Sequence, residues 1–589
     1  MNHAGQLCVK LLHCGNNSLA NPQDQCEKDI FFMPMGLLAL ASALTEAGID
    51  AEIIHSDCER GKVIDELLGF SDLDVVAFDC HWVNQSLPVL ETADLVKRIR
   101  PDVFILLGGF TASFFAEEIL LNHPQVDAII KGDADVPIVK LCEAHVEKLT
   151  AADSAIQAGT GRFLRDVPNL IWRDENGKIH ANQLSYVATA EDMERLDFAC
   201  LDLLRNWEYY RKRSIYWTHF APLNFAPLNL SPLFFLEIGR GCTNTCLSCG
   251  GSAEAQRIIN NRETVAVRSV DSVIATVKKA MSFGFRTFFT DFEFVGSDEW
   301  YMRLFTAIRA DGLDIHYVYS SWALTSIQMV DALSHSFERA FIQLSPESGD
   351  VELRRKNKGA RAFYSNQQLR ECLDYIGTKG NLKVQLYFGY FLAFESSETV
   401  LTTLKFIMEL LLAYPDLVEI GYLPFSTDPA SLLFLHPERY DVSIAVRSFQ
   451  DYVHEIREAY IEKKSSSPDL RLLTPNGISR AESAVLERRI ELFSYMFQSY
   501  RKSISRILQG SGGREIVLNI LRETDIAVAE GVAEEVRKVL LDDGGGGGVR
   551  DALLAETIDA ECEMEKRRRR QSFKAKPQIW LDSAVETRN

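Results

Sequence analysis

Two long series of alternating strand and helix signals constrain the fold of this chain more than any other feature. In the first series, over residues 1–150, short β-rich apolar runs are separated by amphipathic stretches of helical period, such as Met35–Ala47 and Leu87–Arg100. This alternation is typical of an α/β doubly wound parallel sheet. It predicts a Rossmann-like domain with strands at Leu7–His13, Ala51–His55, Asp74–Phe78, Val103–Leu107 and Ala128–Ile130.

The second series covers residues 233–436 and contains six strand signals. These are Phe234–Ile238, Arg286–Asp291, Ile315–Ser320, Ala340–Leu344, Lys383–Phe388 and Leu417–Tyr422. Most are followed by helix-like stretches, for example Val270–Phe283, Asp298–Ala310, Gln367–Thr378 and Glu398–Leu412. Six such units predict a partial β/α barrel that is open on one side.

The rest of the chain divides into three parts. Residues 151–232 have linker composition, with a hairpin expected around Asp174–Gly177 and a short duplication within Ala221–Asn229. Residues 437–543 show helical period, chiefly in Val442–Glu462 and Ala481–Leu508. Residues 544–589 form a glycine-rich and basic tail that we expect to be partly disordered.

Charge and hydropathy narrow the classes of partner. The chain has 63 Lys and Arg against 82 Asp and Glu, a formal charge of −19, which disfavours a nucleic-acid partner. The basic cluster Lys566–Arg570 is therefore expected to be a solvated tail. No apolar run reaches the roughly 18–20 residues that span a bilayer, and the first residues do not resemble a signal peptide. We expect a cytoplasmic protein without a membrane partner.

The strongest chemical motif follows the first barrel strand, where Cys242, Cys246 and Cys249 form a CxxxCxxC pattern. Three thiolates within eight residues can converge on one soft-metal centre, whereas a tetrahedral zinc site needs a fourth ligand. No second CxxC or His pair supplies one, and the other nine cysteines show no ligand spacing. A [4Fe–4S] cubane would keep one iron open for a small bidentate molecule. A zinc loop with a distant fourth ligand and chance spacing are the alternatives.

This loop, placed after the first strand of a six-unit barrel, resembles that of the radical S-adenosylmethionine (SAM) superfamily. A second similarity is the segment Leu344–Gly349, followed by Leu353 and by Asn357–Gly359, which resembles the fourth-strand segment of members that carry a cobalamin-binding domain. The resemblance implies a [4Fe–4S] cluster on Cys242, Cys246 and Cys249, with SAM contacts at Gly250, Gly251, Ser345 and Glu347. For Glu347 the alternative is a strand-end carboxylate that caps the next helix.

The first domain is similar to the cobalamin-binding module of the same family. The similarity is based on three features, which are the segment Met33–Leu37, the Gly108–Gly109 turn and Gly132–Asp133. Glycines at such turns let the backbone approach a large flat corrin that a Cβ would obstruct. The resemblance implies cobalamin contacts at Met35, Gly36, Asp79, His81, Gly108, Gly109, Thr111 and Gly132.

Three departures from the family pattern leave roles open. The DxHxxG signature, which supplies a cobalt-ligating His elsewhere, is absent from the first βα turn, and Asp79-Cys80-His81-Trp82 stands after the third strand instead. His81 could face the cobalt or the corrin edge, or be an ordinary hydrogen-bonded histidine. After the second barrel strand, Asp291 and Glu293 could be a SAM contact, a substrate base, a cluster neighbour or solvated loop acids. After the fifth, the usual Pro-Gly before Glu395 is lost.

By this resemblance the expected activity is cobalamin-dependent methylation. A methyl group would pass from SAM through methylcobalamin to a carbon centre, usually to a substrate radical made by a second SAM and in some members to a nucleophilic aromatic carbon. The Gly-Gly-Ser after Cys249 and the Asp-x-His-Trp turn resemble the branch that includes a tryptophan C-methyltransferase, so we expect an amino-acid, peptide or natural-product substrate. Radical chemistry would need a donor such as flavodoxin or ferredoxin. The alternatives are ring rearrangement or cyclisation, a cobalamin-free radical SAM enzyme, and a cofactor-binding sensor.

Overall fold

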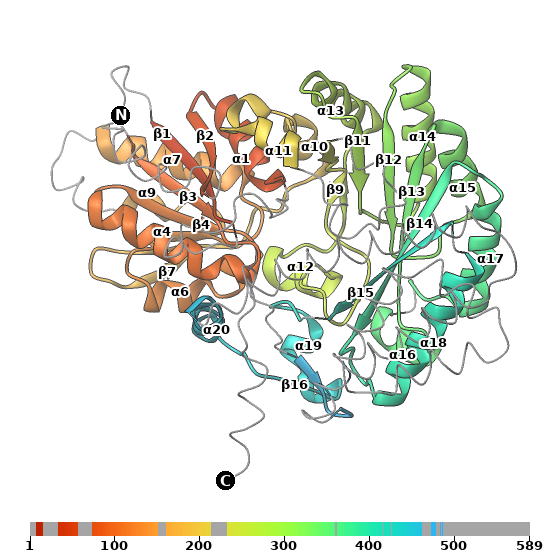
Figure 1. Cartoon of the computed structure of the whole chain (residues 1–589). Coiled ribbons are helices and arrows are strands. Elements are labelled where there is room, and N and C mark those ends of the chain that lie inside the picture. Colours follow the sequence, from red (N-terminus) through yellow and green to blue (C-terminus); the bar gives the residue numbers. More distant parts are fainter. Residues whose placement is uncertain are drawn as a thin grey trace, which may run out of the picture.

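The described residues form two α/β units that lie side by side (Figure 1). This computed structural model describes residues 7–15, 33–56, 73–150, 161–213, 232–359, 362–414, 416–425, 427–461, 473–478, 483 and 486. The first unit is red to orange in the figure and the second is green to cyan. Helix α12 (Ala253–Asn260) lies between them. No helix among the described residues has the length and apolar character that crossing a bilayer requires.

The first unit is built on a parallel sheet, which confirms the predicted fold class. Its strands are β1 (Cys8–His13), β2 (Asp50–His55), β3 (Val75–Asp79), β4 (Phe104–Gly108) and β5 (Ala128–Ile130), in the order β2-β1-β3-β4-β5. The strand order reverses between β1 and β3. In open α/β sheets ligands bind beyond the carboxyl ends of the strands at such a switch point.

Helices cover both faces of this sheet because strand side chains alternate between the faces. Val9 and Leu11 belong to one apolar core and Leu12 to the other. The first core includes residues of α1 (Met35–Glu46) and α7 (Asp135–Thr150), and the second those of η1–α4 (Val83–Gln85, Ser86–Ile99), α5 (Phe110–Phe114) and α6 (Ala116–Asn122).

The segment expected to be a linker contains ordered structure. The predicted hairpin forms as β6 (Leu170–Arg173) and β7 (Ile179–Ala181), but it extends the first sheet antiparallel to β5, because Leu170, Ile171 and Trp172 are buried there. The other elements are α9 (Gly161–Leu164), α10 (Ala190–Arg195), η2 (Leu201–Leu203) and α11 (Trp207–Arg213). The duplication within Ala221–Asn229 lies outside the described residues.

The second unit is the predicted six-stranded partial barrel. Its strands pair in parallel and in chain order: β8 (Leu233–Phe235), β11 (Thr287–Thr290), β12 (His316–Ser321), β13 (Ala340–Glu347), β14 (Leu382–Tyr390) and β15 (Val418–Pro424). Between them run α13 (Val270–Ser282), α14 (Ser297–Ala310), α15 (Ile327–Ser336), α16 (Val351–Lys358), α17 (Asn366–Gly377) and α18 (Ser397–Ala413). A short antiparallel ribbon of β9 (Gly239–Arg240) and β10 (Ala266–Val267) follows β8.

The helical stretch expected over Val442–Glu462 is wrong at its start. Val442–Ile444 forms strand β16, paired antiparallel with β17 (Leu473–Pro475), because this short apolar segment finds a strand partner. Helix α20 (Phe449–Ile461) then packs against α4, and Glu118 accepts hydrogen bonds from the backbone at its start. Elements α19 (Leu432–Leu435) and η5 (Pro437–Arg439) precede it. Most of Ala481–Leu508 and all of the tail lie outside the described residues.

Candidate active site

A cavity of about 500 Å³ lies between the carboxyl edge of the first sheet and the mouth of the barrel. From the first unit it is lined by seven of the eight predicted cobalamin contacts: Met35, Gly36, Asp79, His81, Gly108, Gly109 and Gly132. From the barrel it is lined by Phe235, Glu237, Arg240, Phe289, Asp291 and Phe292, among others. The fold therefore brings these seven residues from four separate segments of the first unit onto one wall.

Thr111, the eighth predicted contact, is not among the lining residues. It is buried, and both its hydroxyl and its backbone N–H donate to the carbonyl of His81, at 2.8 and 3.2 Å. Gly109 lies beside this contact with φ +96°, where a Cβ would come within 2.8 Å of the backbone of Cys80 and His81. Thr111 and Gly109 therefore hold the two turns together and fix the position of His81.

Asp79 carries a feature that fits a ligand with amide groups, such as a corrin. Its Oδ2 is 2.6 Å from Nδ1 of His13, a pair that the sequence analysis did not find. Its Oδ1 is buried and accepts no hydrogen bond from the described residues. Since a buried carboxylate oxygen without a donor is costly, a bound group that donates a hydrogen bond would satisfy it.

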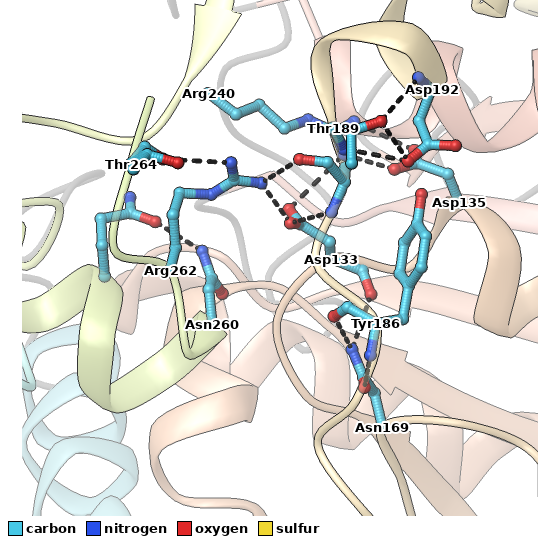
Figure 2. Close-up of polar contacts among 12 residues, drawn as sticks. Asp133, Asp135, Asn169, Tyr186, Thr189, Asp192, Arg240, Asn260, Arg262 and Thr264 are labelled. Carbon is cyan, nitrogen blue, oxygen red and sulfur yellow. Dashed lines mark hydrogen bonds and ion pairs between the residues drawn. The ribbon is translucent and has the colours of Figure 1, made fainter. Parts of the chain in front are cut away.

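An ion-pair network joins the two units (Figure 2), and its members Asp133, Asp135 and Arg240 line the cavity. Arg240 of β9 forms a bidentate pair with Asp135 and also contacts Asp133, at 3.5 Å. Arg262, which follows α12, donates to Asp133 and to the carbonyl of Ala188. Burial lowers the pKa of Arg240, but the neighbouring Asp135 and Asp133 outweigh that effect and raise it. Sequence analysis missed the network because its partners lie more than a hundred residues apart.

The network connects the first-sheet side of the cavity to the cysteine loop. Asp133 follows Gly132, whose Cβ, if present, would lie 2.8 Å from Oδ1 of Asn260. Arg240 precedes Gly241 and Cys242 directly. The turn after β5 and the start of the cysteine loop are therefore held at a fixed separation.

The three cysteines lie on an irregular loop between β9 and α12. Burial raises the pKa of each thiol, that of Cys246 to about 12, and each of Cys242 and Cys246 also raises the pKa of Cys249. Backbone N–H groups donate to the sulfurs of Cys242 and Cys249, each at 3.3 Å. No three His, Cys, Asp or Glu side chains in the described parts of the chain are placed to hold a metal ion. The donor set of buried thiols with N–H donors nevertheless suits an iron–sulfur cluster, whose potential such hydrogen bonds tune.

The cysteine loop is hydrogen-bonded to two later parts of the barrel, helix α16 and the segment after β15. The backbone N–H of Leu247 donates to the carbonyl of Asn357, and that of Gly250 to Oδ2 of Asp428, at 3.2 and 2.9 Å. A Cβ on Gly250 would meet Asp428 at 2.6 Å, whereas one on Gly251 would only touch Cys249 at 3.7 Å. Packing against Asp428 is therefore enough to explain a glycine at position 250, whereas packing does not require one at position 251.

Glu347 lies close to this loop at the end of β13. Its φ is +61°, and burial raises the pKa of its carboxyl. Nζ of Lys358 lies 4.0 Å from its Oε1 and donates to the carbonyl of Ser345. The alternative role of Glu347 as a helix cap is wrong, because Asp350 accepts the N–H of Leu353 and caps α16. Neither Ser345 nor Glu347 lines the cavity, and the charge of Glu347 helps to raise the pKa of Cys246.

The two acids after the second barrel strand take different positions. Glu293 is tied to the end of β12, accepting from the hydroxyl of Ser321 and from the N–H groups of Trp322 and Ala323. Asp291 lines the cavity instead. Glu395, after the fifth strand, accepts two backbone N–H groups of its own turn, and burial raises its pKa to about 8.

Glu237, which sequence analysis missed, faces the same cavity two residues beyond β8. Burial raises the pKa of its carboxyl to about 7; the charge of Asp291 also raises it, and Arg240 opposes both. Its position at the end of the first barrel strand was the available signal. A carboxyl with a pKa near neutrality can both accept and release a proton.

Residues 31–141 match the B12 binding domain family. Among curated relatives, the anaerobic magnesium-protoporphyrin IX monomethyl ester cyclase of Rubrivivax gelatinosus is 27% identical over 163 residues, which are 27% of this chain and 23% of the cyclase. The hopanoid C-3 methylase of Methylococcus capsulatus is 30% identical over 112 residues, 19% of this chain and 22% of the methylase. The chain thus spans less than a quarter of the length of either relative.

Among solved structures, the chain is similar to the radical SAM methyltransferase TsrM of Kitasatospora setae. The form with cobalamin and a [4Fe–4S] cluster has a TM-score of 0.56 at 15% identity, covering 81% of this chain and 85% of that chain. The form with tryptophan and a SAM analogue has a TM-score of 0.50 at 16% identity, covering 70% and 72%. The resemblance seen in the sequence is confirmed: this chain joins a B12-binding domain to the fold of a cobalamin-dependent radical SAM methyltransferase.

Proposed function

We propose that this chain is a cobalamin-dependent radical SAM C-methyltransferase acting on an amino-acid, peptide or natural-product substrate. The observation that carries the proposal is the shared cavity. One wall is the glycine-lined edge of the B12-binding domain, and the other is the barrel face that leads through Gly241 to the cysteine loop. Enclosure between two units is what methyl transfer between two cofactors needs, because it excludes water and aligns the reactants.

Each cofactor has a proposed set of holding residues. Cys242, Cys246 and Cys249 would bind the [4Fe–4S] cluster, and Gly250, Gly251, Ser345 and Glu347 would contact SAM. Met35, Gly36, Asp79, His81, Gly108, Gly109 and Gly132 would contact cobalamin, with Thr111 supporting the His81 turn. When bound, SAM supplies the methyl group and cobalamin carries it.

The protein's own residues supply orientation and proton transfer. Phe235, Phe289 and Phe292 give the barrel wall an aromatic surface that excludes water. Replacing a substrate hydrogen by the methyl group of SAM yields S-adenosylhomocysteine and releases one proton. Glu237 is the group on this wall whose pKa suits its capture.

The direct test is to purify the protein without oxygen in the presence of cobalamin, reconstitute the cluster and record the visible spectrum. We expect a broad iron–sulfur band together with a separate corrin spectrum. Incubation with SAM and reductant should then yield S-adenosylhomocysteine and methylcobalamin before any substrate is supplied. Failure to retain a corrin would contradict the proposal and favour a cobalamin-free radical SAM enzyme.

Ring formation is the second candidate, favoured by the similarity to the protoporphyrin ester cyclase. L-Tryptophan is the first substrate probe because TsrM was solved with tryptophan bound. A methylated product, heavier by one CH₂, supports methyl transfer. A panel of amino acids and aromatic natural products is tested next. A product that contains no more carbon than its substrate supports rearrangement or cyclisation.

The products also separate the two routes of methyl transfer. The polar route uses one SAM and releases one S-adenosylhomocysteine and one proton per methylated product. The radical route uses two SAM and two electrons, and releases S-adenosylhomocysteine, methionine and 5′-deoxyadenosine. Turnover without 5′-deoxyadenosine, and without flavodoxin or ferredoxin, supports the polar route.

A further inference from the structure

Three charged side chains lie at the junction between the end of β13 and helix α16, next to the cysteine loop. They are Glu347, Arg354 and Lys358, and we call them the buried charge group. Arg354 is 0% exposed, the side chain of Lys358 is completely buried, and that of Glu347 is 12% exposed. Because little water screens charges in such a place, they act more strongly on their surroundings than surface charges do.

Arg354 holds its positive charge with no carboxylate oxygen at ion-pair distance in the described part of the chain. Its guanidinium donates only to neutral oxygens, which are the carbonyls of Pro346, Ser348 and Tyr364 and the amide oxygen of Asn366. Arginine does not lose its proton in proteins. A buried cation that is hydrogen-bonded but not paired with an anion favours negative charge nearby.

The other two members carry opposite charges, and both act on the cysteine loop. Nζ of Lys358 lies 4.0 Å from Oε1 of Glu347 and donates to the carbonyl of Ser345. Burial raises the pKa of the Cys246 thiol, the charge of Glu347 raises it further, and the charge of Lys358 lowers it. The Cys246 thiol also donates to the backbone carbonyl of Lys358, at 3.9 Å. A negative charge that develops at this cysteine would therefore be attracted by one of the two side chains and repelled by the other.

We propose that the buried charge group sets the reduction potential of the iron–sulfur cluster on the cysteine loop. The inference rests on the proposed function, because that function places the cluster on the three cysteines. Reduction takes one electron from a donor, such as flavodoxin in the radical route, and converts [4Fe–4S]²⁺ to [4Fe–4S]⁺ without forming or breaking a bond to the protein. Since the reduced cluster is more negative, Arg354 and Lys358 favour reduction and Glu347 opposes it.

The test is a redox titration of the cluster in the full chain, reconstituted without oxygen and reduced with titanium(III) citrate. The electron paramagnetic resonance signal of the reduced cluster reports the midpoint potential. SAM and cobalamin are left out, because Glu347 is a proposed SAM contact and cob(II)alamin has a signal of its own. The other acids whose charges act on the group, Asp350 and Glu293, are the same in every variant.

The expected potentials follow the net charge of the group. Lys358→Gln removes a positive charge and should lower the reduction equilibrium constant about tenfold, which is about 59 mV for one electron. Glu347→Gln removes the negative charge and should raise the constant by a similar factor. The double variant has the same net charge as wild type and should return to the wild-type potential. Loss of packing alone would not produce shifts of opposite sign that cancel.

Lys356→Gln is the matched control. It removes the same charge from the same helix, but Lys356 is exposed, so that water and salt screen it. The potential of this variant should equal that of wild type. A shift as large as that of Lys358→Gln would contradict the role of burial.

Equal potentials in wild type, Lys358→Gln and Glu347→Gln would overturn the inference, and so would shifts of the two variants in the same direction. If Lys358→Gln holds no cluster, Glu347→Gln decides alone, and a potential at or below the wild-type value contradicts the inference. A visible spectrum recorded before the titration separates the two levels. A wild-type chain that binds no cluster contradicts the proposed function, and the inference fails with it, whereas a bound cluster with unshifted potentials contradicts the inference only.

Discussion

The two parallel sheets end facing one another, yet their carboxyl edges carry different residues. The edge of the first sheet presents Gly108, Gly109 and Gly132, so that backbone forms much of the wall. The barrel edge presents Glu237 and Asp291 and continues into the cysteine loop. Parallel topology places the loops after the strands together in both units. The residue types in these loops then decide what each edge can bind. One edge is lined by glycine backbone, and the other carries carboxyl groups and leads to the thiols of the cysteine loop.

The largest expected effect separates the two edges by their cofactors. Changing Cys242, Cys246 and Cys249 together to Ala should abolish the iron–sulfur absorption and leave the corrin spectrum intact, since the thiols lie outside the cavity lining. Cys372→Ala on α17 is the control, because this cysteine does not line the cavity and its thiol donates to the carbonyl of Thr325, so both spectra should stay unchanged. Loss of corrin together with the cluster would show that the two edges do not bind separately.

The next prediction concerns the ion pairs that connect the two edges. Asp133→Asn leaves Arg262 buried without its counter-charge and should lower stability by about 3–5 kcal/mol, the usual cost of breaking a buried pair. Thermal melting of the full chain measures this. Glu143→Gln, which breaks the exposed pair with Lys140 on α7, should change the melting temperature little. Equal changes in melting temperature for the two substitutions would contradict a stabilising role of the buried pair between the two units.

Glu237→Gln tests the barrel edge through pH. Between the usual Glu pKa of 4.5 and about 7, folded protein keeps a proton that the unfolded chain loses, so the unfolding free energy falls as pH rises. The Gln variant lacks this loss and should gain stability relative to wild type between pH 5 and pH 8, by about 3 kcal/mol at most. Melting of cofactor-free protein at both pH values measures it, with the exposed Glu338→Gln as control. A pH-independent difference would refute the raised pKa.

Local patterns carried the fold prediction and the cysteine loop, because period and spacing are properties of neighbouring residues. The resemblance to a cobalamin-binding module pointed to eight residues, and seven of them line the cavity. Contacts between distant residues were out of reach: Arg240 and Asp135 lie 105 positions apart, and nothing in either segment marks the other. The 442–444 strand was misread because three residues are too few to show a period before a true helix begins.

The smallest effect distinguishes a glycine needed by the backbone from one needed by the ligand. Gly109→Ala forces a Cβ against the Cys80–His81 backbone at a positive φ and should lower stability by about 1–3 kcal/mol. Gly108→Ala meets nothing closer than the carbonyl of Ile130 at 4.0 Å and should melt like wild type. If the first edge is shaped for a corrin, Gly108→Ala should still weaken cobalamin retention in equilibrium dialysis. Since the protein itself leaves room for this methyl group, loss of binding without loss of stability would place the ligand against that turn, and unchanged binding would remove Gly108 from the contact surface.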